Sequence, residues 1–321
     1  MKQVEAIFKK VDKHLDEMVQ DVKDQLDRTP SFPDISRLQE DIFDVDLDQP
    51  ALGRFRTPLG MGVAHDGNLV VADSENQRLQ ILNWYGKADD AIKLGRRRFP
   101  KPCCPMDVAV SDDGTCYVSD QANEQIIVCS QKKGVISAFG EGAPVRPRGI
   151  ALTKDGYVLT TDWWQERYCV KKYTKNGDLV SEFGLAKSSG DSMGWPLFLA
   201  VNSKNQVFVS DQGNNRIRVF DSDGKFLFDF ADRDAEDTRK VYGPTGIHID
   251  ADDNVYVCDP NRICVLKYDS SGKFLSEVSL KPYKYENPYA IAVGRQEPRK
   301  IAFTEHRGNH IRFLNVTFGN C

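Results

Sequence analysis

The chain has 321 residues, of which 43 are Lys or Arg and 47 are Asp or Glu, so its formal net charge is -4. This near balance excludes a histone-like polycation, and a hydrophobic fraction of 40% excludes a disordered chain. No apolar stretch approaches the roughly 18 residues of a membrane span, and no apolar signal-peptide region follows Met1. We therefore expect a globular, cytoplasmic protein that does not enter a membrane.

Residues 1–28 are predicted to form an amphipathic helix. Apolar side chains recur at alternating spacings of four and three, the a/d pattern of a coiled coil, at Val4, Phe8, Val11, Leu15, Met18 and Val22. The pattern ends at Thr29 and Pro30. Because the seam covers only about three heptads, this segment would either mediate self-association or pack as a single helix on the rest of the chain. Residues 29–49 follow as an acidic linker.

From residue 50 onward the sequence repeats six times. A leading proline marks each unit, at intervals of 42 to 49 residues: Pro58, Pro105, Pro147, Pro196, Pro244 and Pro288. In five units an Asp lies 15 residues after this proline, at Asp73, Asp120, Asp162, Asp211 and Asp259, whereas the sixth unit has Glu305. A constant offset inside a variable period indicates that the structured part lies between the two landmarks and that loops absorb the length differences.

Each unit contains short, β-branched runs separated by Gly, Asp or Asn, which is typical of antiparallel hairpins. Residues 149–152 and 157–159 are such a pair in the third unit, and residues 216–220 and 225–230 in the fourth. Four strands in each of six units predict an all-β, six-bladed β-propeller over residues 50–321. The last unit ends after its third run, so we predict that residues 42–47 supply the missing strand and close the ring.

The repeats resemble those of the NHL family of six-bladed propellers. The matching stretches are 147–150 and 244–247 at the start of units, and 76–79, 214–217 and 309–311 after the recurring acid. A helix ahead of such a propeller is similar to the C-terminal part of TRIM-NHL proteins, which place RING and B-box zinc modules before a coiled coil. No cysteine precedes Pro58, so neither zinc module is expected in this chain. The resemblance implies that ubiquitin-ligase chemistry would come from another domain or partner.

The recurring Asp is followed five residues later by Arg78, Arg167 or Arg216 in three units and by Gln125 in another. An active site needs its groups once, so residues repeated from blade to blade are expected to be structural. We expect the Asp to accept backbone N–H groups and the Arg to bridge to the next blade.

The sequence predicts no catalytic or metal site, and no cofactor is expected. Two residues after the leading prolines, at the mouth of the channel, only Asp107 offers a carboxylate, whereas calcium needs about six ligands or more. The five histidines are scattered, and the eight cysteines include no C-x-x-C pair. Residues 190–194 match the G-x-S-x-G nucleophile motif, but they fall in a loop between blades and not in a strand–turn–helix.

In a propeller, the loops that link blades and the loops between second and third strands open at one end, which we call the linker face. We expect this face to bind the target through basic and aromatic residues: Arg56, Arg97, Arg98, Lys101, Arg146, Arg148, Trp164, Trp195, Arg239, Lys240, Tyr242, Tyr283, Lys284 and Tyr289. The opposite end carries acidic turns.

Two target classes fit the linker face. Cations for phosphates and rings for stacking favour single-stranded or stem-loop RNA, which TRIM-NHL relatives also bind. Trp, Tyr and Arg are equally the residues of protein hot spots, so a protein recruited for a ubiquitin ligase is the alternative. A third interpretation is that these are ordinary solvated linker residues.

Overall fold

The computed structural model describes residues 51–95, 99–140, 146–165, 167–185, 192–231, 240–281, 285, 287–295, 299–305 and 308–316. All of them belong to the unit Glu40–Cys321. The predicted helix 1–28, the linker 29–49 and the closing strand 42–47 lie outside the described residues. In the described part of the chain, no helix is both long and apolar enough to cross a membrane.

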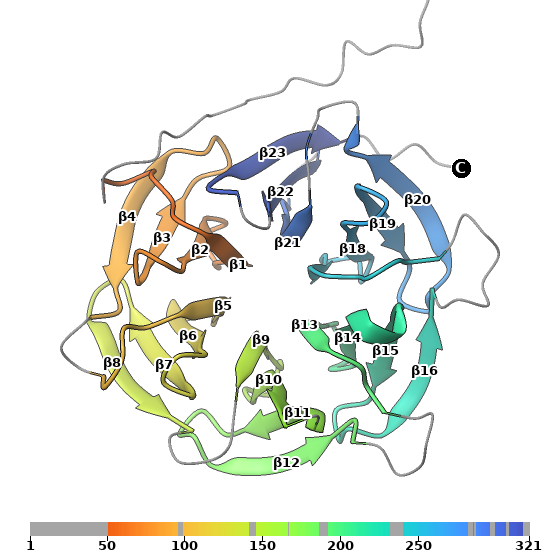
Figure 1. The fold of residues 1–321 in the computed structure, drawn as a ribbon, viewed down its shortest axis with the longest axis horizontal. Coiled ribbons are helices and arrows are strands. Elements are labelled where there is room, and N and C mark those ends of the chain that lie inside the picture. The colour runs from red at the N-terminus through yellow and green to blue at the C-terminus, as the bar shows by residue number, and fades with distance from the viewer. Residues whose placement is uncertain are drawn as a thin grey trace, which may run out of the picture. The chain divides into compact units, whose positions relative to one another are not determined.

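Six antiparallel sheets surround a common axis, and the first strand of each sheet lies innermost (Figure 1). Blade 1 contains β1 (Pro58–Val63), β2 (Leu69–Asp73), β3 (Arg78–Leu82) and β4 (Ala88–Lys93). Blade 2 contains β5 (Pro105–Val110), β6 (Thr115–Asp120), β7 (Gln125–Ser130) and β8 (Gly134–Phe139). Blade 3 contains β9 (Pro147–Leu152), β10 (Val158–Trp164), β11 (Arg167–Tyr173) and β12 (Leu179–Phe183).

The second half of the ring has the same order, and in every blade except the third the recurring acid ends the second strand. Blade 4 contains β13 (Pro196–Val201), β14 (Val207–Asp211), β15 (Arg216–Phe220) and β16 (Phe226–Phe230), with a 3-10 turn η2 (Gln212–Asn214) after β14. Blade 5 contains β17 (Ile247–Ile249), β18 (Val255–Asp259), β19 (Cys264–Tyr268) and β20 (Phe274–Ser279). Blade 6 contains β21 (Pro288–Val293), β22 (Arg299–Glu305) and β23 (Ile311–Val316). The predicted six-bladed propeller is confirmed.

The leading prolines have a common structural role. In blades 1, 2, 3, 4 and 6 the pairing of the first two strands is irregular directly after the proline. Proline cannot donate to the ladder, and a bulge beside it turns the following residues away from regular pairing. The same proline therefore recurs where each blade enters the ring from the preceding linker.

Hydroxyl groups join the inner parts of neighbouring blades. Thr161 Oγ1 donates to the carbonyl of Leu197 at 2.8 Å, and Thr304 Oγ1 donates to the carbonyl of Leu59 at 2.7 Å. The second of these bonds connects blade 6 to blade 1, and the bond from Thr57 N to Asn309 Oδ1 does the same at 2.8 Å. Blades 1 and 6 are thus in direct contact on the inner side of the ring.

Aromatic pairs join the outer parts of blades 2 to 5. A Phe at the end of each fourth strand packs on the aromatic residue that ends the third strand of the next blade, as Phe139–Tyr173, Phe183–Phe220 and Phe230–Tyr268, with ring centroids 5.0 to 5.6 Å apart. The fold leaves space for these rings, because a Cβ on Gly224 would lie only 2.4 Å from the Phe183 ring. Such pairs add to stability beyond the area that they bury.

Candidate recognition surface

A buried carboxylate closes the linker end of five blades. In each, the recurring Asp accepts the backbone N–H of a residue just before the leading proline, at 2.6 to 2.9 Å; the donors are Arg56, Cys104, Arg146, Gly194 and Tyr242. We call each such Asp with its donors a carboxylate clamp. The clamps agree with the expected structural role of the Asp residues, because buried backbone donors need partners.

The basic partners of the clamps differ from the expectation. Arg78 and Arg216 bind Asp73 and Asp211 at 2.7 and 3.1 Å within their own blade. Both also donate to carbonyls of the linker before that blade, at Arg54 and Ser192. Arg167 instead pairs with Glu182 of its own blade at 2.5 Å, and its side chain is 59% exposed. Links between blades are made instead by the hydroxyls of Thr161 and Thr304, by Asn309 and by the carboxylate of Asp107.

Two features of the clamps were missed by the sequence reasoning. Lys171, from the middle of β11, is the basic partner of Asp162 at 2.7 Å. An Asn three residues after the Asp also donates to the carboxylate in blades 1, 2 and 4: Asn76, Asn123 and Asn214. The repeated Asp-x-x-Asn spacing is visible in the sequence and could have revealed the second feature.

Above the clamps, blades 3 and 4 carry a basic and aromatic cluster. The Arg148 guanidinium lies 5.7 Å from the ring centroid of Trp163, and Trp163 meets Trp195 edge-on at 5.7 Å. We call these three residues the Arg–Trp cluster. Trp195 is 49% exposed and has a positive φ of 62°, which holds its backbone in the left-handed region. The backbone N–H of Gln212 donates to its carbonyl at 3.2 Å.

The Arg148 side chain is incompletely bonded. Its Nε is buried, and no described residue offers this atom a hydrogen-bond acceptor. A guanidinium carries five N–H donors in a planar fork, and an unmatched donor in such a place has a free-energy cost. Nε itself is closed to solvent, so a ligand with phosphate or carbonyl oxygens would meet only the accessible part of this half-buried side chain.

The other predicted surface residues fall into three groups. Arg56, Lys101, Arg146 and Tyr242 are exposed, although Arg56 Nε pairs with Glu75 at 2.6 Å, and Lys240 is half-buried. Tyr289 is buried, so its predicted place on the exposed face is wrong. The remaining positions lie outside the described residues: Arg97, Arg98, Arg239, Tyr283, Lys284 and the side chain of Trp164.

Tyr289 is buried because it helps to fill the centre of the ring. Its ring meets Phe198 of blade 4 at 5.2 Å, past Gly246 of the intervening blade 5. A Cβ on Gly246 would lie 2.5 Å from the carbonyl oxygen of Tyr289. The absence of a side chain at Gly246 therefore permits the backbones of blades 5 and 6 to approach closely, and Gly246 N donates to the Tyr289 carbonyl.

Asp107 of blade 2 lies in the same central region. Its carboxylate accepts the N–H groups of Ile150 at 3.0 Å and of Val108 at 2.9 Å. Burial raises the pKa of Asp107 to about 8, although these backbone donors oppose the shift. Among the described residues, no three His, Cys, Asp or Glu side chains converge as metal ligands.

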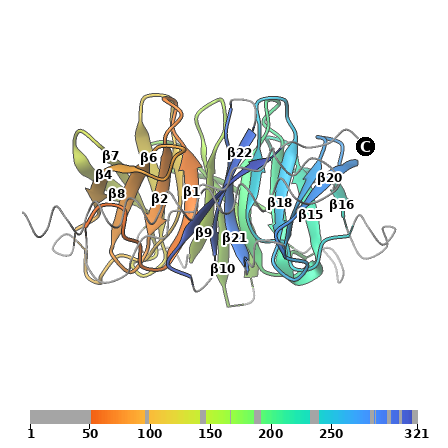
Figure 2. The same cartoon turned by 90° about the horizontal axis from the view of Figure 1, so that it is seen from above.

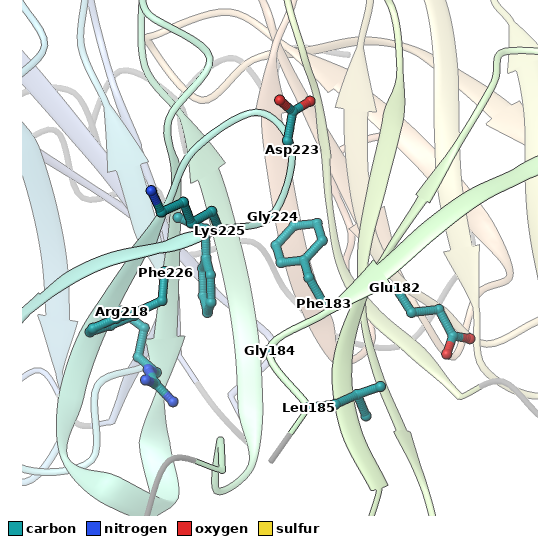
Figure 3. Close-up of a pocket in the computed structure, with 10 residues that line it drawn as sticks. Glu182, Phe183, Gly184, Leu185, Arg218, Asp223, Gly224, Lys225 and Phe226 are labelled. Atoms are coloured by element: carbon teal, nitrogen blue, oxygen red, sulfur yellow. The ribbon is translucent and has the colours of Figure 1, made fainter. Parts of the chain in front are cut away.

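A hollow of about 770 Å³ lies between the outer strands of blades 3 and 4. Figure 3 shows Phe183 and Phe226 facing its interior, with Gly224 beside the Phe183 ring. Arg218 lies over Phe226 at 4.7 Å and pairs with Asp229 at 3.1 Å. These contacts belong to the aromatic pairing of neighbouring blades, so the hollow is explained by the architecture.

Comparison with known proteins agrees with this fold. The model of the NHL repeat matches residues 55–82 and 193–220, the parts of blades 1 and 4 that run through the third strand. The chain is an all-β, six-bladed propeller with NHL repeats, and such a propeller suggests a platform for recognition or protein interaction. It is similar to Protein brain tumor of Drosophila melanogaster, with 26% identity over 137 residues. The match spans 42% of this chain and only 13% of that protein.

Solved propellers with other activities share the fold. Virginiamycin B lyase from Staphylococcus aureus has a TM-score of 0.60 at 20% identity, over 88% of this chain and 89% of that one. A gluconolactonase from Xanthomonas campestris has a TM-score of 0.61 at 14% identity, over 83% and 88%. At these identities the likeness shows the fold alone.

Proposed function

We propose that this propeller is the non-catalytic target-recognition part of a TRIM-NHL-like system and binds single-stranded RNA on its linker face. The Arg–Trp cluster is the observation that carries the proposal. It joins the exposed indole of Trp195 with the half-buried side chain of Arg148. Unpaired bases stack on aromatic rings, and phosphate oxygens accept from arginine, so one nucleotide could use both groups.

A protein target is the second candidate. Trp195 and Tyr242 are 49% and 42% exposed, and exposed aromatic anchors of this kind also form the centres of protein interfaces. Such a target could be recruited for a ubiquitin ligase. The two candidates differ in salt dependence, because each phosphate contact displaces counterions whereas an aromatic protein interface does not.

The test is fluorescence anisotropy of the full chain with a uridine-rich single strand and with a stem-loop RNA. We expect charge reversal of Arg97, Arg98 and Arg148 together to abolish binding. Charge reversal of Lys132 and Lys133, exposed lysines between the third and fourth strands of blade 2, is the control and should leave binding unchanged. Unchanged RNA retention by the triple variant would eliminate the RNA proposal and favour the protein target.

A further inference from the structure

Two adjoining cavities open at the end of the propeller opposite the linker face, among the turns between first and second strands. The inner cavity, of about 400 Å³, is bordered by residues of blades 1, 3, 4, 5 and 6. The outer cavity, of about 500 Å³, lies between blades 1 and 6. Val63, Gly294 and Arg295 line both. Figure 2 shows the ring edge-on, with the connections gathered at its two ends. Cavities of this size match small-molecule sites.

The acids of the inner cavity are already engaged. Arg299 pairs with Asp250 and with Asp252. Asp253 accepts the backbone N–H of Ser203 at 2.8 Å and its hydroxyl at 2.5 Å. Arg299 balances one of the two carboxylates that it contacts, and Ser203 satisfies Asp253 by hydrogen bonding without cancelling its charge.

The inner cavity is also lined by two further cations, Lys154 and Arg295. Among the described residues, no carboxylate pairs with the side chain of Lys154 or of Arg295, although both line the space. His248 lies beside them, and burial followed by the charge of Arg295 lowers its pKa to about 4 even though Asp250 opposes the shift. The imidazole is therefore neutral at physiological pH, so Lys154 and Arg295 are the two cations that an anion bound in this cavity would contact.

The outer cavity has preformed aromatic walls. Trp84 donates its indole N–H to the Gly67 carbonyl at 2.7 Å and meets Phe313 edge-on. Tyr85 is 62% exposed, and Lys300 lies 3.9 Å from the centre of its ring. The Trp84 ring is held in place by these contacts, and the exposed Tyr85 ring offers open surface beside it on which a flat ligand can stack.

We propose that the two cavities together bind a free nucleoside monophosphate. Its base would stack against Trp84 and Tyr85 in the outer cavity, and its phosphate would lie at Arg295 and Lys154 in the inner one. Arg295 connects the two halves because it lines both cavities. The aromatic outer cavity and the cations of the inner cavity together suit a ligand in which an aromatic ring is joined to a compact anion. The site is separate from the linker face and does not depend on RNA binding there.

The test is isothermal titration calorimetry of the full chain with AMP and UMP, and with ribose 5-phosphate as a probe that lacks a base. We expect both nucleotides to bind and ribose 5-phosphate to bind more weakly. Arg295→Ala should weaken nucleotide binding by about tenfold or more, as the loss of charge-assisted hydrogen bonds requires. Tyr85→Ala should weaken AMP binding and leave ribose 5-phosphate unaffected.

Matched variants make the outcome decisive. Trp195→Ala on the linker face and Lys132→Ala on a distant turn should bind AMP like the wild type. Because Arg295 and Tyr85 are exposed, thermal unfolding should show that their variants remain folded. Absence of nucleotide binding at millimolar concentration, binding that Arg295→Ala leaves unchanged, or binding seen only with a 5′-phosphorylated oligonucleotide would each overturn the proposal.

Discussion

The carboxylate clamps and the Arg–Trp cluster occupy the same end of the propeller but differ in repetition and burial. A clamp recurs in five blades, and its Asp is always buried. The cluster is built from β9, β10 and the linker before β13, and it combines an exposed indole with the half-buried side chain of Arg148. Repetition therefore marks what every blade needs to fold, whereas a combination found in one place marks what a ligand would recognise.

The largest expected effect comes from breaking a clamp. Asp73 accepts hydrogen bonds from Arg56 N, Asn76, Arg78 and Gln80, and its side chain is fully buried. Asp73→Ala should lower the free energy of unfolding by about 3 to 5 kcal/mol. The substitution leaves the buried guanidinium of Arg78 and several hydrogen-bond donors without the carboxylate that they bind. Urea denaturation would measure the loss.

Glu75→Ala is the matched control for Asp73→Ala. Glu75 also pairs with an arginine, Arg56, but both side chains are more than half exposed. Its removal should cost about 1 kcal/mol or less, as exposed ion pairs do. Equal losses in the two variants would contradict the assignment of the clamp as an element of the architecture.

Asp107 is an intermediate case, because it is buried like a clamp but occurs in only one blade. The pKa of Asp107 is about 8 in the folded protein, whereas an ordinary Asp, as in the unfolded chain, has a pKa of 3.8. Between these pH values the folded chain keeps a proton that the unfolded chain has released. Stability should fall as pH rises between these values, by up to about 1.4 kcal/mol per pH unit. Above the folded pKa the loss is complete.

Urea denaturation between about pH 7 and pH 8 measures this loss, and comparison with Asp107→Asn separates it from the effect of the buried thiols, whose raised pKa values also lower stability toward alkaline pH. His248 has its ordinary pKa of 6.5 lowered to about 4, so its own destabilising effect develops only as pH falls below 6.5. Asp107→Asn should show a flatter pH dependence than the wild type. An unaltered slope would mean that Asp107 is ionised in the folded state.

The fold was predictable from the sequence because its determinants repeat in register. The Pro-to-Asp offset reports the distance from the start of one strand to the end of the next, which the hairpin geometry fixes. Lys171 could not be predicted as a clamp partner, because it reaches Asp162 through side-chain direction across two paired strands. Tyr289 was placed wrongly for a related reason: its burial depends on Gly246 and Phe198, which come from other blades.

In the Arg–Trp cluster, Trp195→Ala should affect RNA binding far more than stability. Loss of one stacking ring should weaken binding of a uridine-rich single strand by about 1 to 3 kcal/mol. The free energy of unfolding should change by about 1 kcal/mol or less, because the Trp195 side chain is half exposed and contributes mainly an edge contact to Trp163. Anisotropy and urea denaturation on the same sample separate the two effects.

Tyr85→Ala serves as the control for Trp195→Ala, since it removes an exposed ring from the opposite end. It should bind the RNA with wild-type affinity. If Trp195→Ala lost stability but kept its affinity, the indole would belong with the clamps as part of the architecture.

The smallest expected effect is a change in salt dependence on removing one exposed cation near the cluster. Lys101 lies on the linker of blade 2, where its backbone is held by Asn123 and its side chain is exposed. If Lys101 contacts one phosphate, Lys101→Ala should reduce the slope of log affinity against log salt by about 0.7. Stability should remain at the wild-type value, because the backbone bonds to Asn123 do not involve the lysine side chain. A slope equal to that of the wild type would place the RNA path away from blade 2 and confine it to the surface around blades 3 and 4.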